Sequence, residues 1–180
     1  MKPAEHMMKP LGLLLAALFF ISCEGDPGPM GPEGPQGPAG PVGMAFEVEA
    51  DFSGENGFNP EPFGFGDIEV LDSDIVMVYW LWDVDENAGD IWQPLPATIY
   101  FEDGSEMIYG FDHTSSDVQL FLYGNTDLGT VGAEYTQDQL FKVVILPVDY
   151  VESSKVDMSN LKEVMKAVDE NKVKRLRPVK

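Results

Sequence analysis

The sequence predicts a mainly β protein, in which an antiparallel β-sandwich follows a collagen-like stalk and precedes one short C-terminal α-helix. Three observations predict this fold class. Glycine recurs at every third position from residue 25 to residue 43, about seven short strand-like segments follow between turn residues, and a helical period appears only over 158–168. Short strands separated by turns are typical of an antiparallel sandwich. We therefore expect four parts: a signal peptide at 1–22, the stalk at 23–43, the sandwich at 44–154, and a helix with a basic tail at 155–180.

The N-terminal segment has the pattern of a secretory leader. An uninterrupted apolar run from Leu11 to Ile21 is too short to span a membrane as a helix, and it suits the central region of a signal peptide. Cys23 follows a small residue directly after this run, as in the lipobox of bacterial lipoproteins. We therefore expect cleavage before Cys23 and lipidation of the new N-terminus, which would anchor the chain to a membrane. The alternative is a plain secreted protein in which Cys23 has no role.

Six consecutive Gly-x-y triplets, each with a proline, follow this cysteine. Only glycine fits the axis at which the three polyproline-II chains of a collagen helix meet, and at the rise of such chains the repeat would extend roughly 55 Å. The repeat is compatible with a homotrimer joined through a triple helix and with a monomer that has a stiff spacer. The stalk glycines are Gly25, Gly28, Gly31, Gly34, Gly37, Gly40 and Gly43.

The first half of the predicted sandwich contains two strands of different kinds. Residues 45–52 alternate apolar and acidic side chains, which is the pattern of a half-buried strand. Residues 53–66 are rich in Gly, Pro and Phe, and we expect a loop whose aromatic rings pack on the core. Residues 75–82 are apolar on both faces, as in a central strand, so both faces need a cover. The edge of the other sheet, the C-terminal helix or a neighbouring subunit could supply the second cover.

The second half contains a hairpin and two further strands. Residues 91–101 and 106–112 flank the turn sequence 102–105, in which Asp-Gly predicts a hairpin. Residues 118–123 alternate again, and residues 140–146 form the last strongly apolar strand.

One apolar stripe predicts the C-terminal helix. Its members recur at helical spacing behind a candidate cap, Asp157. We expect the chain after this helix to be loose. The stripe consists of Met158, Leu161, Met165 and Val168.

Charge is strongly segregated along the chain. Residues 24–152 hold 26 acidic side chains and one basic one, whereas residues 155–180 hold eight of the eleven bases. So acidic a domain repels nucleic acid, and we expect no nucleic-acid partner. The sequence leaves two alternatives for the basic tail. It could fold back on the acidic domain, or it could lie against anionic lipid headgroups.

No catalytic constellation is visible in the expected mature chain. His113 is its only histidine and the lipidation site is its only cysteine, which excludes Cys-His nucleophiles and zinc clusters. We expect His113 to lie in a turn or on the surface, and we expect no enzymatic activity.

Two weaker patterns are candidate binding sites. Oxygen-bearing side chains at alternate positions suit Ca²⁺, although the glycine and glutamate of an EF-hand loop are missing, and a solvated hairpin tip is the alternative. These residues are Asp83, Asp85, Asn87 and Asp90. Aromatic residues could form a platform for sugar stacking, with core packing as the alternative. These residues are Tyr79, Trp80, Trp82, Trp92 and Tyr100.

As a set, these motifs resemble those of a known group of proteins. Cys23 leads into the repeat, strands follow at 74–79 and 91–96, and the pattern closes at 141–147. The chain thereby resembles the collagen-like lipoproteins of the Bacteroidetes. Acidic residues soon after Cys23 are similar to the surface-export signal of that group. The resemblance implies an exported protein with a C-terminal β domain, lipid-anchored at the outer membrane or the cell surface, and it brings no activity with it.

The expected function is therefore that of a stalked structural or interaction module, without catalysis and without a cofactor. A carbohydrate- or Ca²⁺-binding β-sandwich is the alternative. The sequence leaves the identity of any protein or glycan ligand open.

Overall fold

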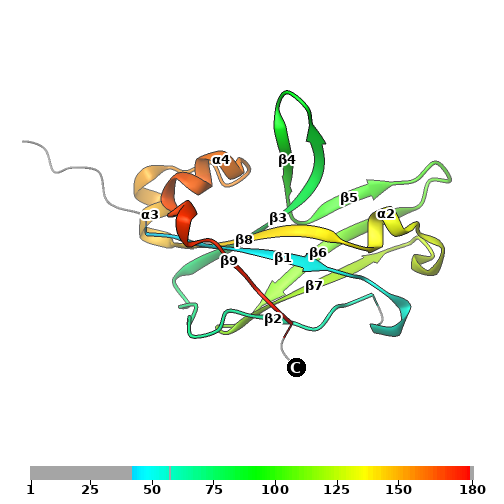
Figure 1. The fold of residues 1–180 in the computed structure, drawn as a ribbon, viewed down its shortest axis with the longest axis horizontal. Helices are drawn as coiled ribbons and strands as arrows, with labels where there is room; N and C mark the ends of the chain where they lie inside the picture. Colours follow the sequence, from blue (N-terminus) through cyan, green and yellow to red (C-terminus); the bar gives the residue numbers. More distant parts are fainter. Residues whose placement is uncertain (1–41, 57, 179–180) are drawn as a thin grey trace, which may run out of the picture. The chain divides into compact units, whose positions relative to one another are not determined.

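The computed structural model describes residues 42–56 and 58–178, which form two β-sheets packed together (Figure 1). The mainly β prediction is confirmed for this part of the chain, and the two-sheet structure is consistent with a β-sandwich. The five-stranded sheet has the order β4-β3-β8-β1-β9, and the four-stranded sheet has the order β2-β7-β6-β5. The expected anchor at Cys23 and the glycines from Gly25 to Gly40 lie outside the described residues.

All strand pairs among the described residues are antiparallel except β1–β9. The five-stranded sheet comprises β1 (Met44–Ala50), β3 (Asp74–Asp85), β4 (Gly89–Pro94), β8 (Gln139–Pro147) and β9 (Lys174–Arg175). The four-stranded sheet comprises β2 (Phe63–Gly64), β5 (Ala97–Tyr100), β6 (Glu106–His113) and β7 (Asp117–Gly124). The α-helices are α2 (Ala133–Thr136), α3 (Val148–Ser154) and α4 (Leu161–Val164). The 3₁₀ turns are η2 (Gly54–Asn56), η3 (Leu128–Thr130), η4 (Met165–Ala167) and η5 (Glu170–Lys172).

Side chains of both sheets build one apolar core between them, the intersheet core. Alternate residues of β3 and β8 point into it, among them Trp80 and Phe141. The fully buried Tyr109 of β6 lies against both, with ring centroids 4.2 Å from Trp80 and 5.9 Å from Phe141. Because one aromatic cluster joins strands of both sheets, the two sheets are expected to unfold together.

The aromatic segment before β3 packs on this core, as its composition predicts. Phe63 and Phe65 are 1% and 3% exposed. The expectation of a loop without strands over 53–66 is wrong in one respect, because β2 pairs there with β7. A two-residue strand carries too little alternation to be read from a sequence.

The other face of the five-stranded sheet is buried as well. Residues 148–178, which follow β8, are called the C-terminal segment. Tyr79, Val144 and Leu146 point away from the intersheet core and form a second cluster, the outer cluster, with residues of this segment. The C-terminal segment is therefore the cover that the second face of β3 needs (Figure 1). Its buried members in the outer cluster are Val164, Ala167 and Val168.

The C-terminal helix is shorter than predicted and begins elsewhere. It does not run over 158–168, because α4 begins after Asn160, whose side chain accepts a hydrogen bond from the Lys162 amide at 3.1 Å, and changes to a 3₁₀ turn at Met165. Asp157 instead accepts hydrogen bonds from Ser159. Helix α3, which the apolar stripe does not include, precedes α4.

The expectation of a loose tail is wrong for the described residues up to 178. Strand β9 pairs in parallel with β1, and Leu176 is buried in the intersheet core. The Leu176 amide donates to the Glu47 carbonyl at 2.9 Å, and Arg175 lies 3.2 Å from the Glu49 carboxylate. Of the two alternatives for the basic tail, folding back on the acidic domain is the one observed. β1 would otherwise be an unpaired edge strand, and β9 covers it.

The predicted strand over 91–101 is two strands in different sheets. β4 pairs with β3, whereas β5 pairs with β6 through the predicted hairpin, in which Gly104 adopts φ +82°. Pro94 and Pro96 lack the amide protons that a continuous ladder would need, so the chain leaves one sheet and enters the other between them.

The domain begins before the predicted boundary at residue 44. The amides of Val42 and Gly43 both donate to the Ala167 carbonyl at 2.9 Å, and Gly43 forms a parallel bridge with Val168. A side chain at position 43 would collide with Leu146 of the outer cluster. Gly43 therefore belongs to the folded domain, which explains its being glycine without any reference to a triple helix.

Candidate functional site

The five aromatic residues proposed as a sugar platform do not lie on one surface. Tyr79 is 0% exposed and Trp80 is 4% exposed, and the two point to opposite faces of β3. Tyr100 is exposed on β5 of the other sheet. Trp82 and the half-buried Trp92 remain as surface aromatics of the β3–β4 hairpin. The platform prediction is therefore wrong for the buried pair, which a central strand covered on both faces cannot expose.

The polar groups of the buried pair have protein partners. The Tyr79 hydroxyl donates to the Met158 carbonyl at 2.6 Å, and the Trp80 indole N–H donates to Gln139 at 2.9 Å. Burial, together with the negative charge of Asp157, raises the pKa of Tyr79. Tyr79 is therefore a neutral hydrogen-bond donor that ties the C-terminal segment to β3, and it is not available to a ligand.

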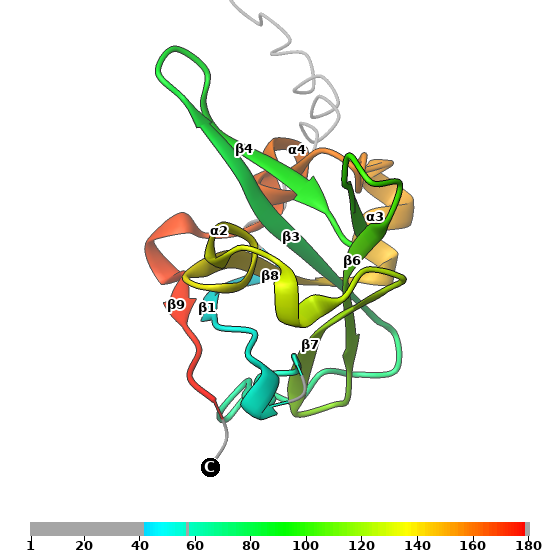
Figure 2. The same cartoon turned by 90° about the vertical axis from the view of Figure 1, so that its right-hand side faces the viewer.

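The proposed calcium residues lie at the tip of the β3–β4 hairpin, which projects beyond the rest of the fold (Figure 2). The Asp85 carboxylate accepts the amides of Asn87 and Ala88 at 2.8 and 2.7 Å, and these bonds lower its pKa. Asp83 accepts the amide of the following residue. Within the described residues, no group of three or more His, Cys, Asp or Glu side chains is placed to hold a metal ion. The Asp85 carboxylate is thus explained by turn formation.

A groove between β4 and α4 is the best candidate for a ligand site. Its volume is about 800 Å³, and Trp92 and Leu161 are apolar residues of its wall. Asp90, Asp157 and Asn160 add polar groups to the same wall. The Lys142 ammonium group lies 4.8 Å from the centre of the Trp92 ring, which holds that ring in place by a cation–π contact.

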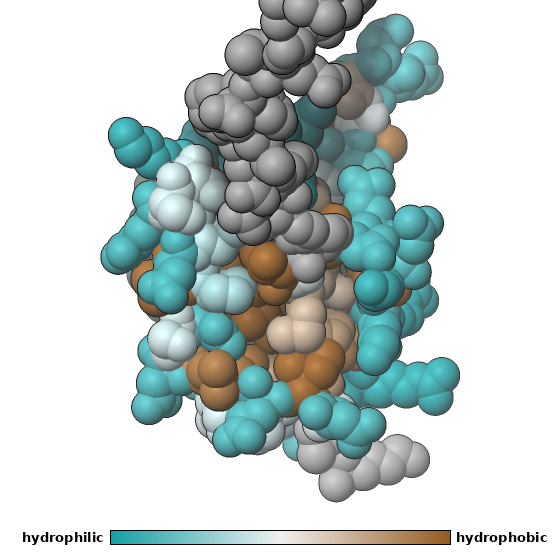
Figure 3. Space-filling model, turned by 90° about the vertical axis from the view of Figure 1, so that its left-hand side faces the viewer, coloured by the Kyte–Doolittle hydropathy of each residue, from teal (hydrophilic) through white to brown (hydrophobic). Residues whose placement is uncertain are grey.

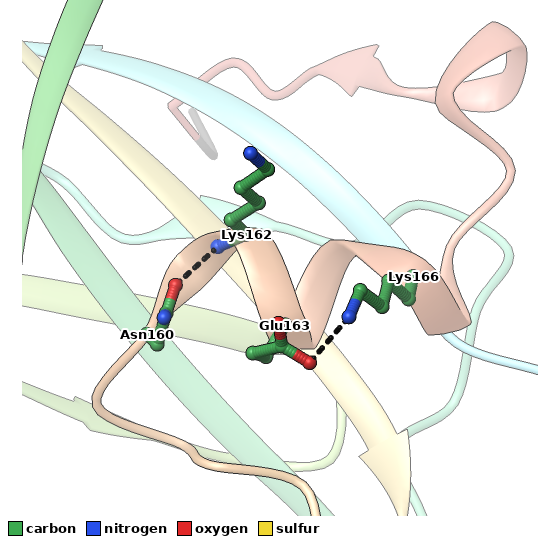
Figure 4. A network of polar contacts seen from close by, with 4 residues as sticks. All are labelled: Asn160, Lys162, Glu163 and Lys166. Atoms are coloured by element: carbon green, nitrogen blue, oxygen red, sulfur yellow. Dashed lines mark hydrogen bonds and ion pairs between the residues drawn. The ribbon is translucent and has the colours of Figure 1, made fainter. Parts of the chain in front are cut away.

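Helix α4 and the 3₁₀ turn η4 contribute two lysines, Lys162 and Lys166, to the wall of this groove (Figure 4). Lys166 and Glu163 point toward each other and form an ion pair of 2.6 Å, whereas the side chain of Lys162 extends from another side of the helix. Both partners of the pair are exposed, so it contributes little to stability. Asn160 caps the helix with its side-chain oxygen. The groove thus offers an aromatic ring, carboxylates and an ammonium group to one ligand.

His113 lies at the exposed end of β6, as expected, where its Nδ1 is 3.2 Å from the Thr114 carbonyl. Ser116 interacts with Thr114 within the same turn. Trp92 and Asp90 stand out as candidate binding residues in the sequence, whereas Asp157, Asn160 and Leu161 could not be recognised there as groove residues. No local signal could have found them, because they reach the groove only after the chain has formed both sheets.

Comparisons with protein-family models, with curated proteins and with solved structures find no match for this chain. Among the described residues, none of the helices has both the length and the apolar character that crossing a membrane requires. The class that the fold itself defines is a mainly β, two-sheet domain with a covering C-terminal segment.

Proposed function

We propose that this chain is an exported, lipid-anchored protein of the outer membrane or cell surface, which acts as a stalked structural or interaction module without catalysis. The collagen-like repeat begins two residues after Cys23 and runs to Val42. Resemblance to the collagen-like lipoproteins of the Bacteroidetes supports the same assignment.

One structural observation carries the proposal, namely the direct join between repeat and domain. Val42 is the last residue of the sixth triplet, and its amide and that of Gly43 are already bonded to Ala167. As a polyproline-II segment, the repeat would span roughly 55 Å between the proposed anchor and the domain.

Replacing Cys23 with alanine is expected to release the full chain from membranes. The wild-type chain should sediment with the membrane fraction and require detergent for extraction, because acyl chains bind by about 0.8 kcal/mol per buried methylene. Gly34→Ala is the matched control, since it alters the stalk and keeps the anchor. A C23A chain that stays in the membrane fraction, or a wild-type chain that is soluble from the start, contradicts the lipid anchor.

A carbohydrate ligand in the groove beside Trp92 is the second candidate function. The observation that favours it is the aromatic ring, fixed by Lys142, next to carboxylates and an amide. Sites for small polar ligands commonly combine an apolar wall with a few directed polar groups. On this hypothesis the hydroxyl groups of the sugar bond to Asp157 and Asn160.

Trp92→Leu is expected to weaken glycan binding by the full chain at least about tenfold, which corresponds to about 1.4 kcal/mol. Leucine preserves apolar packing in the outer cluster but removes the aromatic face. Trp82→Leu is the control, because Trp82 is 46% exposed and is not among the groove residues. An array of bacterial and host glycans gives the measurement. Absence of binding by the wild-type chain, or equal losses in the two variants, would exclude this groove as a glycan site.

A further inference from the structure

A second groove lies where the repeat enters the domain. It opens beside the start of β1, has a volume of about 340 Å³, and is more apolar than the groove at Trp92. Val42 is 40% exposed in its wall. Figure 3 shows the face at which β1 begins, with apolar side chains gathered in its middle among hydrophilic ones. The residues that matter here are Val42, Met44, Ile68, Val168, Lys172 and Lys174.

The position of this groove relative to the repeat is the main observation. Gly43 follows the glycine spacing but is bonded to Ala167 and packed beside Val168, so it cannot occupy the axis of a triple helix. The sixth triplet, Gly40-Pro41-Val42, is therefore the last that can. If three chains join through the repeat, their Val42 residues lie around one axis, and the surface next to Val42 on each domain faces the other copies.

The charges at the rim suit such a contact. Three domains as acidic as this one repel each other, and the repulsion is largest where they are closest. Lys172 and Lys174 lie at the groove. Of these two lysines, Lys172 forms an ion pair of 3.2 Å with Asp169, which also lines the groove, and no ion pair of Lys174 is found among the described residues. The tail that folds back along β1 thus brings basic groups to the place where neighbouring acidic domains would meet.

We propose that the groove beside Val42 is the contact through which copies of this chain associate as a homotrimer, with a second copy as its occupant. The proposal rests on the collagen-like stalk of the proposed function, but not on the lipid. Six triplets alone would make only a short triple helix, and an apolar contact directly at its end would add to its stability, because the helix would hold the domains at high local concentration.

The mass of the full chain in detergent, measured by analytical ultracentrifugation, tests this contact. The wild-type chain is expected to sediment as a trimer and Val42→Asp as a monomer, because the charge would have to be buried between copies. Ala39→Asp is the matched control, since it places the same charge at the same position of the preceding repeat triplet. It is expected to remain a trimer. A monomeric wild type, a trimeric V42D, or equal dissociation of both variants overturns the proposal.

A second variant gives a positive signal that does not depend on loss of association. Val42→Cys is expected to form disulfide-linked chains under mild oxidation, whereas Tyr100→Cys, at an exposed site on the other sheet, is expected not to. Equal cross-linking at the two sites overturns the proposal even if V42D fails to fold. Release of C23A from membranes reports on the anchor alone, so a monomer that is still anchored refutes the contact and leaves the proposed function standing.

Discussion

Replacing Phe141 with alanine is expected to lower the free energy of unfolding by about 3–5 kcal/mol. Phe141 is 0% exposed at the intersheet core, on a strand that pairs with both β1 and β3. Its ring packs edge-on against Phe52 and Tyr109, with centroids 6.1 and 5.9 Å away. The substitution removes these contacts and leaves a cavity that three strands cannot all move to fill.

Urea unfolding of the full chain, followed by tryptophan fluorescence, measures this loss. Tyr100→Ala is the control, because Tyr100 is 77% exposed and its truncation should change the free energy by less than about 0.5 kcal/mol. If the two alanine variants lose similar amounts, the intersheet core is not where the stability of the domain resides.

Gln139→Leu is expected to cost about 2–4 kcal/mol, although it places an apolar residue of similar size at a buried site. The Gln139 oxygen accepts from the Trp80 indole at 2.9 Å, and its amide donates to the carbonyls of Glu134 and Gln137 at 3.1 and 2.6 Å. Leucine would leave the buried Trp80 indole N–H without this partner, and it would also remove the bonds to the two carbonyls. Each unsatisfied buried group costs more than an ordinary hydrogen bond contributes.

The control for this glutamine is Gln93→Leu, at a half-buried position of β4 in the same sheet. It is expected to change stability by less than about 0.5 kcal/mol. A blue shift of the Trp80 emission in Gln139→Leu should accompany the loss of stability. A Gln139→Leu protein as stable as the wild type would show that the Trp80 N–H finds another partner.

The long strands could be predicted because their sequences are both periodic and strongly apolar. β8 and β3 alternate between the intersheet core and the outer cluster, and both faces are apolar because both are covered. β9 could not be predicted, since two basic residues carry no strand signal and pair only because β1 has a free edge. Likewise, the sequence does not show that β4 and β5 belong to different sheets, because this depends on how the chain crosses between the sheets at Pro94 and Pro96.

The candidate groove was predictable to a smaller extent. Trp92 can be recognised in the sequence as a candidate binding residue, but whether it lines a site depends on which face of the β3–β4 hairpin is exposed to solvent. Asp157 and Asn160 reach it because the C-terminal segment folds over β3, and that packing depends on tertiary contacts such as the Tyr79 hydroxyl with Met158. Conversely, the sequence around Asp85 also fits a metal ligand, because turn-forming and metal-binding carboxylates follow similar spacing rules, whereas in the structure Asp85 bonds the amides of its own turn.

The glycine spacing and the structure also differ on where the repeat ends. Spacing alone assigns Gly43 to the stalk, as the seventh glycine of a regular series. Its contacts assign it to the domain, because Ala167 binds its amide and Leu146 leaves no room for a side chain. The repeat therefore contains six complete triplets that end at Val42, and the amide of Val42 is bonded to the C-terminal segment through the Ala167 carbonyl.

The mass of the mature chain, purified from membranes and measured intact, tests the central claim of a lipid-anchored stalk most directly. We expect the mature chain to lack residues 1–22 and to begin at Cys23, with a mass excess that corresponds to acyl chains. An unmodified Cys23, or an N-terminus at another residue, would contradict it.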